Sequence, residues 1–119
     1  MSGSDFVAHV LDLLRPLGGV AARRMFGGHG LFRRGLMFAL IDDDVLYLKV
    51  DDRTRPDFVA VGAAPFTYAS RGRTVTMSYY EAPPGLFDDP DEMRAWAQKA
   101  LAAASRDSIR RGSPPMRPR

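Results

Sequence analysis

The chain has 119 residues, of which 45% are hydrophobic and 26% are charged, so it can fold as one domain around a packed core. It contains no cysteine, which excludes a disulfide framework, a thiol nucleophile and thiolate metal sites. The formal net charge is +3, but residues 105–119 hold five arginines and one aspartate, a charge of +4 that leaves −1 on residues 1–104. These charges predict a folded domain over 1–104 and a disordered, arginine-rich tail over 105–119.

No targeting or membrane-spanning segment is expected. Residues 1–5 lack the basic and apolar regions of a signal peptide. The longest apolar run, residues 36–41, is six residues long, against about 20 for a span of the bilayer. We therefore expect a cytoplasmic protein that has no membrane partner.

In the first half of the chain, the pattern predicts one helix followed by strands. Apolar residues recur at helical spacing over residues 4–15, and Pro16 with the following glycines ends the helix. Strand-forming segments follow at 23–26, 31–33, 36–41 and 45–50, with predicted turns at 27–30, 34–35 and 42–44. We interpret these segments as three main strands. The run 36–41 is apolar at every position, as in a strand that is covered on both faces.

The second half predicts a short helix, a hairpin and a long final helix. Asp51 or Asp52 caps the short helix, whose expected apolar anchors are Phe58, Val59 and Val61. The hairpin pairs residues 66–68 with 75–80 across a turn at 70–73. Asp89, Pro90 and Glu92 form the start of the last helix, whose apolar stripe runs from Met93 to Ala104 with Trp96 as the expected core anchor. The order α-β(3)-α-β(2)-α indicates an α+β fold with helices packed on an antiparallel sheet.

No catalytic residue, metal site or cofactor is expected from the motifs. Asp42, Asp43 and Asp44 are adjacent acids without the alternating pattern of a calcium loop, so a solvated turn is favoured over a metal site. The glycines of 27–30 match neither the dinucleotide nor the P-loop spacing, so a hairpin turn is favoured there over a phosphate site. His29, at the expected tip of that turn, has no serine or acid beside it in sequence to support catalysis.

Arginines form two groups that suit an anionic or nucleic-acid ligand. They are also ordinary surface residues, and for the first group we favour that interpretation. The tail is interpreted in the same way as a solvated terminus, although a basic tail binds nucleic acid nonspecifically by releasing counterions. The candidate contacts are Arg23, Arg24, Arg33 and Arg34 in the body and Arg110 and Arg111 in the tail.

An apolar surface on the uncovered face of the sheet is the second candidate site. In a two-layer fold one face of the sheet meets solvent, yet the run 36–41 is apolar throughout. We expect a second copy, giving a two-fold homodimer, or a regulatory protein to cover this face. The alternative is that a helix or the N-terminal segment covers it. The residues expected there are Met37, Ala39, Ile41, Tyr47 and Tyr80.

The run Ala-Arg-Arg-Met-Phe-Gly-Gly-His-Gly-Leu-Phe at 22–32, together with 37–41, 46–51 and 55–58, resembles the N-terminal domain of the TfoX/Sxy family of competence regulators. The resemblance continues through 65–68, 77–80 and the helix around Trp96, and covers about residues 5–104. It implies a two-layer sandwich. It also implies a non-enzymatic transcriptional coactivator that works with another regulator on genes for DNA uptake. The full-length regulators add a helical C-terminal domain, which residues 105–119 are too short to form.

Overall fold

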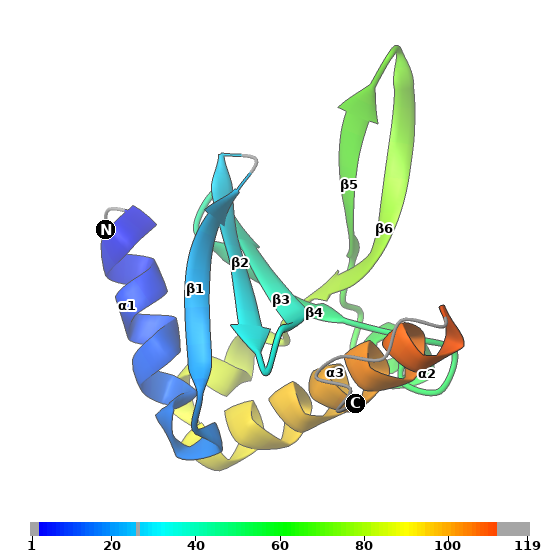
Figure 1. Ribbon diagram of the computed structural model, residues 1–119. Helices are drawn as coiled ribbons and strands as arrows, with labels where there is room; N and C mark the ends of the chain where they lie inside the picture. Colours follow the sequence, from blue (N-terminus) through cyan, green and yellow to red (C-terminus); the bar gives the residue numbers. More distant parts are fainter. Residues whose placement is uncertain (1–2, 26, 112–119) are drawn as a thin grey trace, which may run out of the picture.

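The helices α1 (Gly3–Leu13) and α3 (Pro90–Arg110) lie against one face of a six-stranded antiparallel sheet in the computed structural model, which describes residues 3–25 and 27–111 (Figure 1). The order of strands in the sheet is β1-β2-β3-β4-β6-β5. The predicted α+β class, with helices on one face of an antiparallel sheet, is therefore confirmed. The remaining elements are β1 (Val20–Met25), β2 (Gly28–Arg33), β3 (Leu36–Asp42), β4 (Val45–Lys49), α2 (Arg55–Ala60), β5 (Pro65–Ser70), β6 (Arg73–Glu81) and the short 3-10 helices η1 (Arg15–Leu17) and η2 (Pro84–Asp88).

Four strands, and not the three main strands expected, come before α2. The segment 27–30 was expected to be a turn, but Gly28, His29 and Gly30 lie in β2 and pair with β1. A glycine is needed at 28 for space, because a Cβ there would collide with the carbonyl oxygen of Ile41 on β3. His29 is accordingly a residue within the sheet and not the tip of a loop.

Tight two-residue turns close three of the hairpins. In each turn both residues have positive φ, which is the type I′ geometry that matches the twist of the flanking strands. Two of the three acids at 42–44 are such turn residues, in agreement with the favoured solvated turn. In the turn Arg34-Gly35 the φ values are 52° and 79°. They are 51° and 58° in Asp43-Asp44, and 52° and 77° in Arg71-Gly72.

A β-bulge in β3 places two consecutive side chains of the apolar run 36–41 against the helices. Leu31 pairs with Ala39, whereas Phe32 pairs with Met37, so β3 contains one extra residue, Phe38. A bulge changes the alternation of side chains, and Phe38 and Ala39 are both fully buried in the core. The bulge therefore accounts for the apolar neighbours Phe38 and Ala39, whereas Met37 and Leu40 of the same run face away from the helices.

The core lies between the sheet and the helices, where α3 packs mainly on β3 and β4 and α1 packs on β1. Of the three anchors expected in α2, only Phe58 is buried, since Val59 and Val61 are 59% and 52% exposed. The Phe58 ring meets the Trp96 ring edge-on at 4.8 Å between centroids. Trp96 is only partly buried, so it flanks the core and is not its centre.

The last helix begins as predicted and ends later than predicted. The Asp89 carboxylate accepts hydrogen bonds from the backbone N–H groups of Asp91 and Glu92, which confirms the cap. We expected the helix to stop near Ala104, but it continues to Arg110, because Arg106 and Asp107 anchor its last turns through ion pairs. Residues 105–110, predicted as part of a disordered tail, therefore belong to α3, and residues 112–119 lie outside the described residues.

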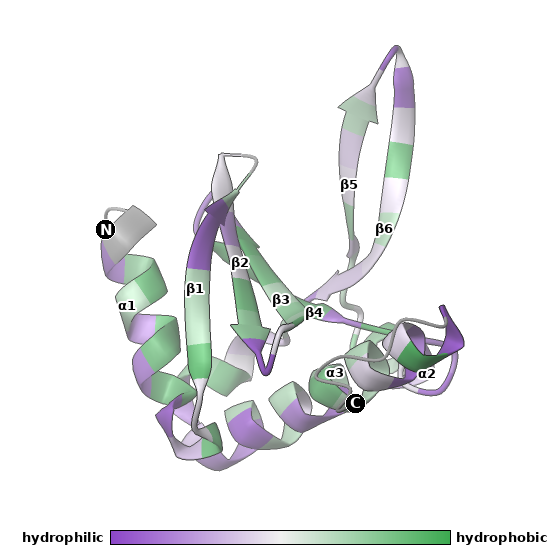
Figure 2. Cartoon of the chain, in the orientation of Figure 1, coloured by the Kyte–Doolittle hydropathy of each residue, from purple (hydrophilic) through white to green (hydrophobic). Residues whose placement is uncertain are grey.

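The β5–β6 hairpin differs from the rest of the sheet. It extends away from the helices in Figure 1, and most of its residues are exposed or half-buried. In Figure 2 the green of apolar residues concentrates on α1, β2 and β3, whereas the hairpin is mostly pale or purple. The sheet thus has a covered part, β1–β4, and a projecting part, β5–β6.

Candidate functional site: a methionine cleft on the outer face

The five residues expected on the uncovered face do not share one face. Ala39 and Ile41 face the helices and are 0% and 3% exposed, so they are not available to a partner. Tyr80 also lies on this inner face, because it pairs with Leu48 and packs on the core. Met37 and Tyr47 lie on the opposite, outer face. The extra residue Phe38 separates Met37 from Ala39, so the expected alternation along β3 fails at that point.

A cleft of about 420 Å³ opens on the outer face, between the start of β3, the base of the hairpin and the last turns of α3. We call it the methionine cleft, because three of the six methionines of the chain line it. Thioether side chains are flexible and polarizable, so they adapt to apolar groups of different shapes. Its lining residues are Met25, Met37, Met77, Gly35, Leu36, Lys49, Ser78, Tyr79, Ala104, Asp107, Ser108 and Arg111.

The floor of the methionine cleft consists of polar groups that are bonded to one another. The buried Lys49 ammonium donates a hydrogen bond to Ser78 Oγ at 2.7 Å and lies 3.6 Å from the Asp107 carboxylate. The Tyr79 hydroxyl donates to the backbone oxygen of Met37 at 3.3 Å. Burial, with a smaller contribution from the charge of Asp107, raises the pKa of Tyr79 to about 12. These bonds fix the position of Met37 and tie α3 to β4.

Asp107 links the floor of the methionine cleft to its rim. Burial raises the pKa of this carboxyl, but the hydrogen bond from Arg110 and the charges of Lys49 and Arg111 outweigh burial, so the pKa lies below its ordinary value. Arg110 and Arg111 each approach the Asp107 carboxylate to 3.0 Å. Their side chains are 72% exposed, and Arg111 lines the cleft. The rim therefore presents a cation to a bound group.

A second ion pair holds α3 beside the start of α2. The Arg106 guanidinium donates two hydrogen bonds to the Asp51 carboxylate, at 2.5 and 3.1 Å. The Asp51 carboxylate also accepts from the backbone N–H groups of Arg53 and Thr54. The hydrogen bond from Arg106 is the main reason that the pKa of Asp51 falls from 3.8 to about 2. Asp51 is thus a structural anchor, and its carboxylate caps the turn that leads into α2, as predicted, whereas Thr54, the residue directly before the helix, makes no side-chain cap bond.

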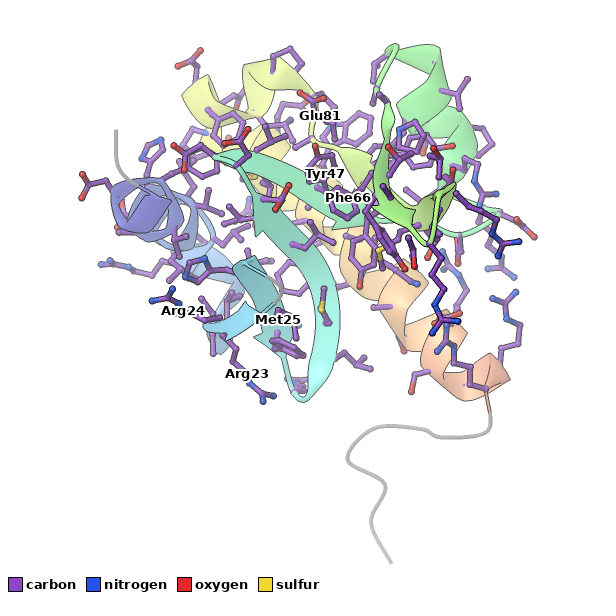
Figure 3. All side chains as sticks on the ribbon, turned by 90° about the horizontal axis from the view of Figure 1, so that it is seen from above. Arg23, Arg24, Met25, Tyr47, Phe66 and Glu81 are labelled. Atoms are coloured by element: carbon purple, nitrogen blue, oxygen red, sulfur yellow. The ribbon has the colours of Figure 1, made fainter. Side chains whose placement is uncertain are left out.

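The arginines of the body do not form one binding surface. Arg23 and Arg24 are neighbours on β1, so their side chains leave opposite faces of the sheet (Figure 3). The Arg23 guanidinium lies over the Phe32 ring at 5.2 Å. Arg33 donates to the backbone oxygens of Leu17 and Gly18. Arg34, the fourth candidate, is a residue of a type I′ turn.

Aromatic rings form a row on the outer face, from β4 onto β5. The Tyr47 and Phe66 rings meet edge-on at 4.9 Å, and the Phe66 and Tyr68 rings lie 6.4 Å apart. Figure 3 shows Tyr47 and Phe66 close to Glu81 at the base of the hairpin. Burial raises the pKa of Tyr47, as do the charges of Glu81 and the aspartates of the neighbouring turn.

Sequence reasoning singled out Met37 and Arg111 but missed the other residues that line the cleft with them. Lys49 lies at the end of an otherwise mostly apolar strand, and Met25 and Met77 lie on strands far apart in sequence. One signal was available: Asp107 is the only acid among the five arginines of residues 105–119. An isolated acid in such a segment indicates a specific pairing partner. Within the described residues, no group of three His, Asp or Glu side chains is placed to hold a metal ion, and no helix has the length and hydropathy to cross a membrane.

Comparison with known proteins identifies the family of this chain. The family model of the TfoX N-terminal domain matches residues 12–104. The chain is 27% identical over 90 residues to DNA transformation protein TfoX1 of Aliivibrio fischeri, across 76% of this chain and 43% of that protein. It is 26% identical over 102 residues to protein Sxy of Escherichia coli, across 86% of this chain and 49% of that protein. The chain spans about half the length of these curated relatives.

Proposed function

The chain belongs to the TfoX N-terminal domain family, and we propose from this premise that it is a non-enzymatic regulatory module of the cytoplasm. It acts by protein–protein contact in the transcriptional regulation of DNA uptake. One relative bears the name of a DNA transformation protein, and both relatives match over this domain. The observation that carries the contact mechanism is the methionine cleft.

The methionine cleft has the properties of a docking site for an apolar side chain. Its volume of about 420 Å³ is within the usual range for binding pockets. The thioethers of Met25, Met37 and Met77 provide an adaptable apolar wall, and methionine is favoured at protein interfaces. Arg111 on the rim pairs with an acidic residue of the partner. We therefore expect a partner segment that has an apolar anchor next to an acid.

The polar floor of the cleft does not support a catalytic role. Ser78 and Lys49 are 2.7 Å apart, a spacing that a serine nucleophile and a lysine base would also have. The Lys49 ammonium, however, is itself the donor to Ser78 and also faces Asp107. An ammonium group has no lone pair to accept the serine proton. The arrangement is that of a structural ion pair, which supports a binding module.

The proposal is tested in the source bacterium by deleting the gene and restoring variants. Wild type should restore transcripts of the DNA-uptake genes and the frequency of transformation. Met37→Glu places a charge in the methionine cleft and should lower both at least about tenfold, since an uncompensated charge in an apolar contact costs several kcal/mol. Val59→Glu is the matched control, because Val59 is 59% exposed on α2, and it should restore both.

Folding of each variant is checked by thermal unfolding and its cellular level by immunoblot. Met77→Glu provides a second cleft variant at a half-buried position. A deletion strain with normal DNA uptake would overturn the regulatory role. Full activity of both cleft variants would overturn the cleft as the contact site.

Nonspecific nucleic-acid binding is the alternative function, and the charge of +4 on residues 105–119 favours it. Against it, Asp107 neutralises part of the charge of Arg110 and Arg111, and the arginines of β1 point to opposite faces. A labelled duplex titrated at two salt concentrations decides the question. Binding that weakens steeply with salt, and that is lost on Arg110→Gln and Arg111→Gln substitution, supports the alternative.

A further inference from the structure

The projecting hairpin ends in an uncovered strand. β5 is the last strand in the sheet order, so only β6 pairs with it among the described strands. Thr67, Tyr68 and Ala69 are exposed, and Tyr68 is 45% exposed. Figure 1 shows the hairpin standing away from the helices. An open edge presents unpaired backbone N–H and C=O groups.

The two edges of the sheet are protected very differently. β1, the other edge, carries Arg23 and Arg24, and α1 packs beside it. Charged side chains and a covering helix are the usual devices that stop an edge from pairing with another chain. β5 has no charged residue, and its single proline, Pro65, is the first residue of the strand. The β5 edge therefore lacks the devices that protect β1.

The turn at the end of the hairpin determines which backbone groups face outwards. Ser70 and Arg73 flank a two-residue turn, so this pair exchanges its backbone hydrogen bonds across the hairpin. Hydrogen-bonded and non-hydrogen-bonded positions then alternate along β5. The N–H and C=O groups of Thr67 and Ala69 consequently point away from β6, towards the open edge.

We propose that β5 pairs antiparallel with β5 of a second copy of the chain, around a two-fold axis at Tyr68. In this register Thr67 faces Ala69 of the second copy. The outward backbone N–H and C=O groups of each residue form hydrogen bonds with those of the other. The strand is self-complementary, because no like charges oppose each other across the axis. The result is one continuous sheet through both copies.

Side chains on both sides of the axis support a second copy as the occupant. The exposed Tyr68 ring meets its symmetry mate, so the aromatic row Tyr47–Phe66–Tyr68 becomes continuous across the dimer. The surface is separate from the methionine cleft, and the proposal does not depend on the proposed function.

A single cysteine tests the register, because the chain has no cysteine of its own. Positions facing each other on the axis in a non-hydrogen-bonded pair have Cα atoms about 4.5 Å apart, within the range of about 4.4–6.8 Å that a disulfide needs. Under mild oxidation with copper-phenanthroline, Tyr68→Cys should become mostly a covalent dimer. Val59→Cys, which is also exposed but lies on α2, should stay mostly uncrosslinked.

Sedimentation velocity of the cysteine-free chain tests the contact without crosslinking. At about 100 µM, wild type and Val59→Lys should sediment as dimers and Tyr68→Lys as a monomer, since two lysines would oppose each other on the axis. If wild type is monomeric at this concentration, the proposal is overturned. The β5 edge would then be a site for an extended segment of another protein. A Tyr68→Lys variant that remains dimeric, or a Tyr68→Cys variant that does not crosslink, also overturns it.

Discussion

The four strands β1–β4 and the hairpin β5–β6 belong to one sheet but differ in what they contact. β3 and β4 lie under α3, and their inward side chains, such as Ala39 and Leu48, are completely buried. The hairpin packs against β4 only at its base, and Tyr68 near its tip is 45% exposed. The covered strands therefore form the core of the domain, whereas the projecting strands leave backbone and aromatic surface exposed.

The largest effect is expected on the free energy of unfolding, when the loss of a ring in the covered part is compared with the loss of a ring in the hairpin. Phe38→Ala should lower the free energy of unfolding by about 3–5 kcal/mol, because it empties a fully buried site. Tyr68→Ala should change it by less than about 0.5 kcal/mol. Urea denaturation followed by far-UV circular dichroism, at a concentration where both chains are monomeric, measures the difference. Similar costs at both sites would mean that the hairpin is as tightly packed as β1–β4.

Within the covered part, two glycines of β2 should differ in how much a substitution by alanine costs in stability. Gly28→Ala should cost about 2–3 kcal/mol, because its Cβ meets the backbone of Ile41, which cannot move without separating β2 from β3. Gly30→Ala should cost less than about 1 kcal/mol, since its Cβ meets only the ends of the Met25, Met37 and Phe32 side chains. Thermal unfolding ranks the two variants. A larger cost at 30 would show that the methionines are rigidly held.

The covered part also depends on pH through Asp51. Its pKa is about 2 in the folded chain and 3.8 ordinarily, so its ion pair with Arg106 stabilises the fold above about pH 4 and loses this effect as pH falls towards 2. Asp51→Asn should lower stability at pH 7 by about 1–2 kcal/mol and flatten the dependence between pH 4 and 2. Asp52→Asn is the control, because the Asp52 side chain is 91% exposed. Equal pH profiles for Asp51→Asn and wild type would contradict the assignment.

The smallest effect concerns the tip of the hairpin. Arg71 has a φ of 52°, in a region that asparagine and glycine adopt more easily than arginine. Arg71→Asn should therefore stabilise the hairpin by about 0.5 kcal/mol. Slower amide hydrogen exchange within β5 and β6, with unchanged exchange in β3, is the expected result. Equal slowing in both parts would indicate that the hairpin and β1–β4 open together.

Local patterns in the sequence were sufficient for much of this fold. The cap at Asp89 and the apolar stripe from Met93 to Ala104 each depend on residues within one element, and both are present. The hairpin turn at Arg71-Gly72 could be predicted for the same reason, since a glycine between two strands of alternating polarity favours a tight turn.

The faces of the sheet were not predictable in the same way. The bulge at Phe38 is a property of the pairing between β2 and β3, and it reverses the face on which Met37 lies relative to Ala39. The continuation of α3 to Arg110 depends on Asp51 and Lys49, which are more than fifty residues away. The methionine cleft combines residues from five separate segments. Interactions of this kind depend on the folded arrangement and leave no local periodicity in the sequence.

The position of α3 along the chain has a consequence for synthesis. All six strands precede α3, yet α3 covers the apolar face of β3 and β4. While the ribosome is still translating residues 90–110, the nascent sheet has no cover over side chains such as Leu46 and Leu48. Exposed apolar strands at that stage are substrates for chaperones and sites of aggregation. Substitutions that weaken α3 should therefore reduce the yield of folded protein in the cell more than they reduce the stability of the purified chain.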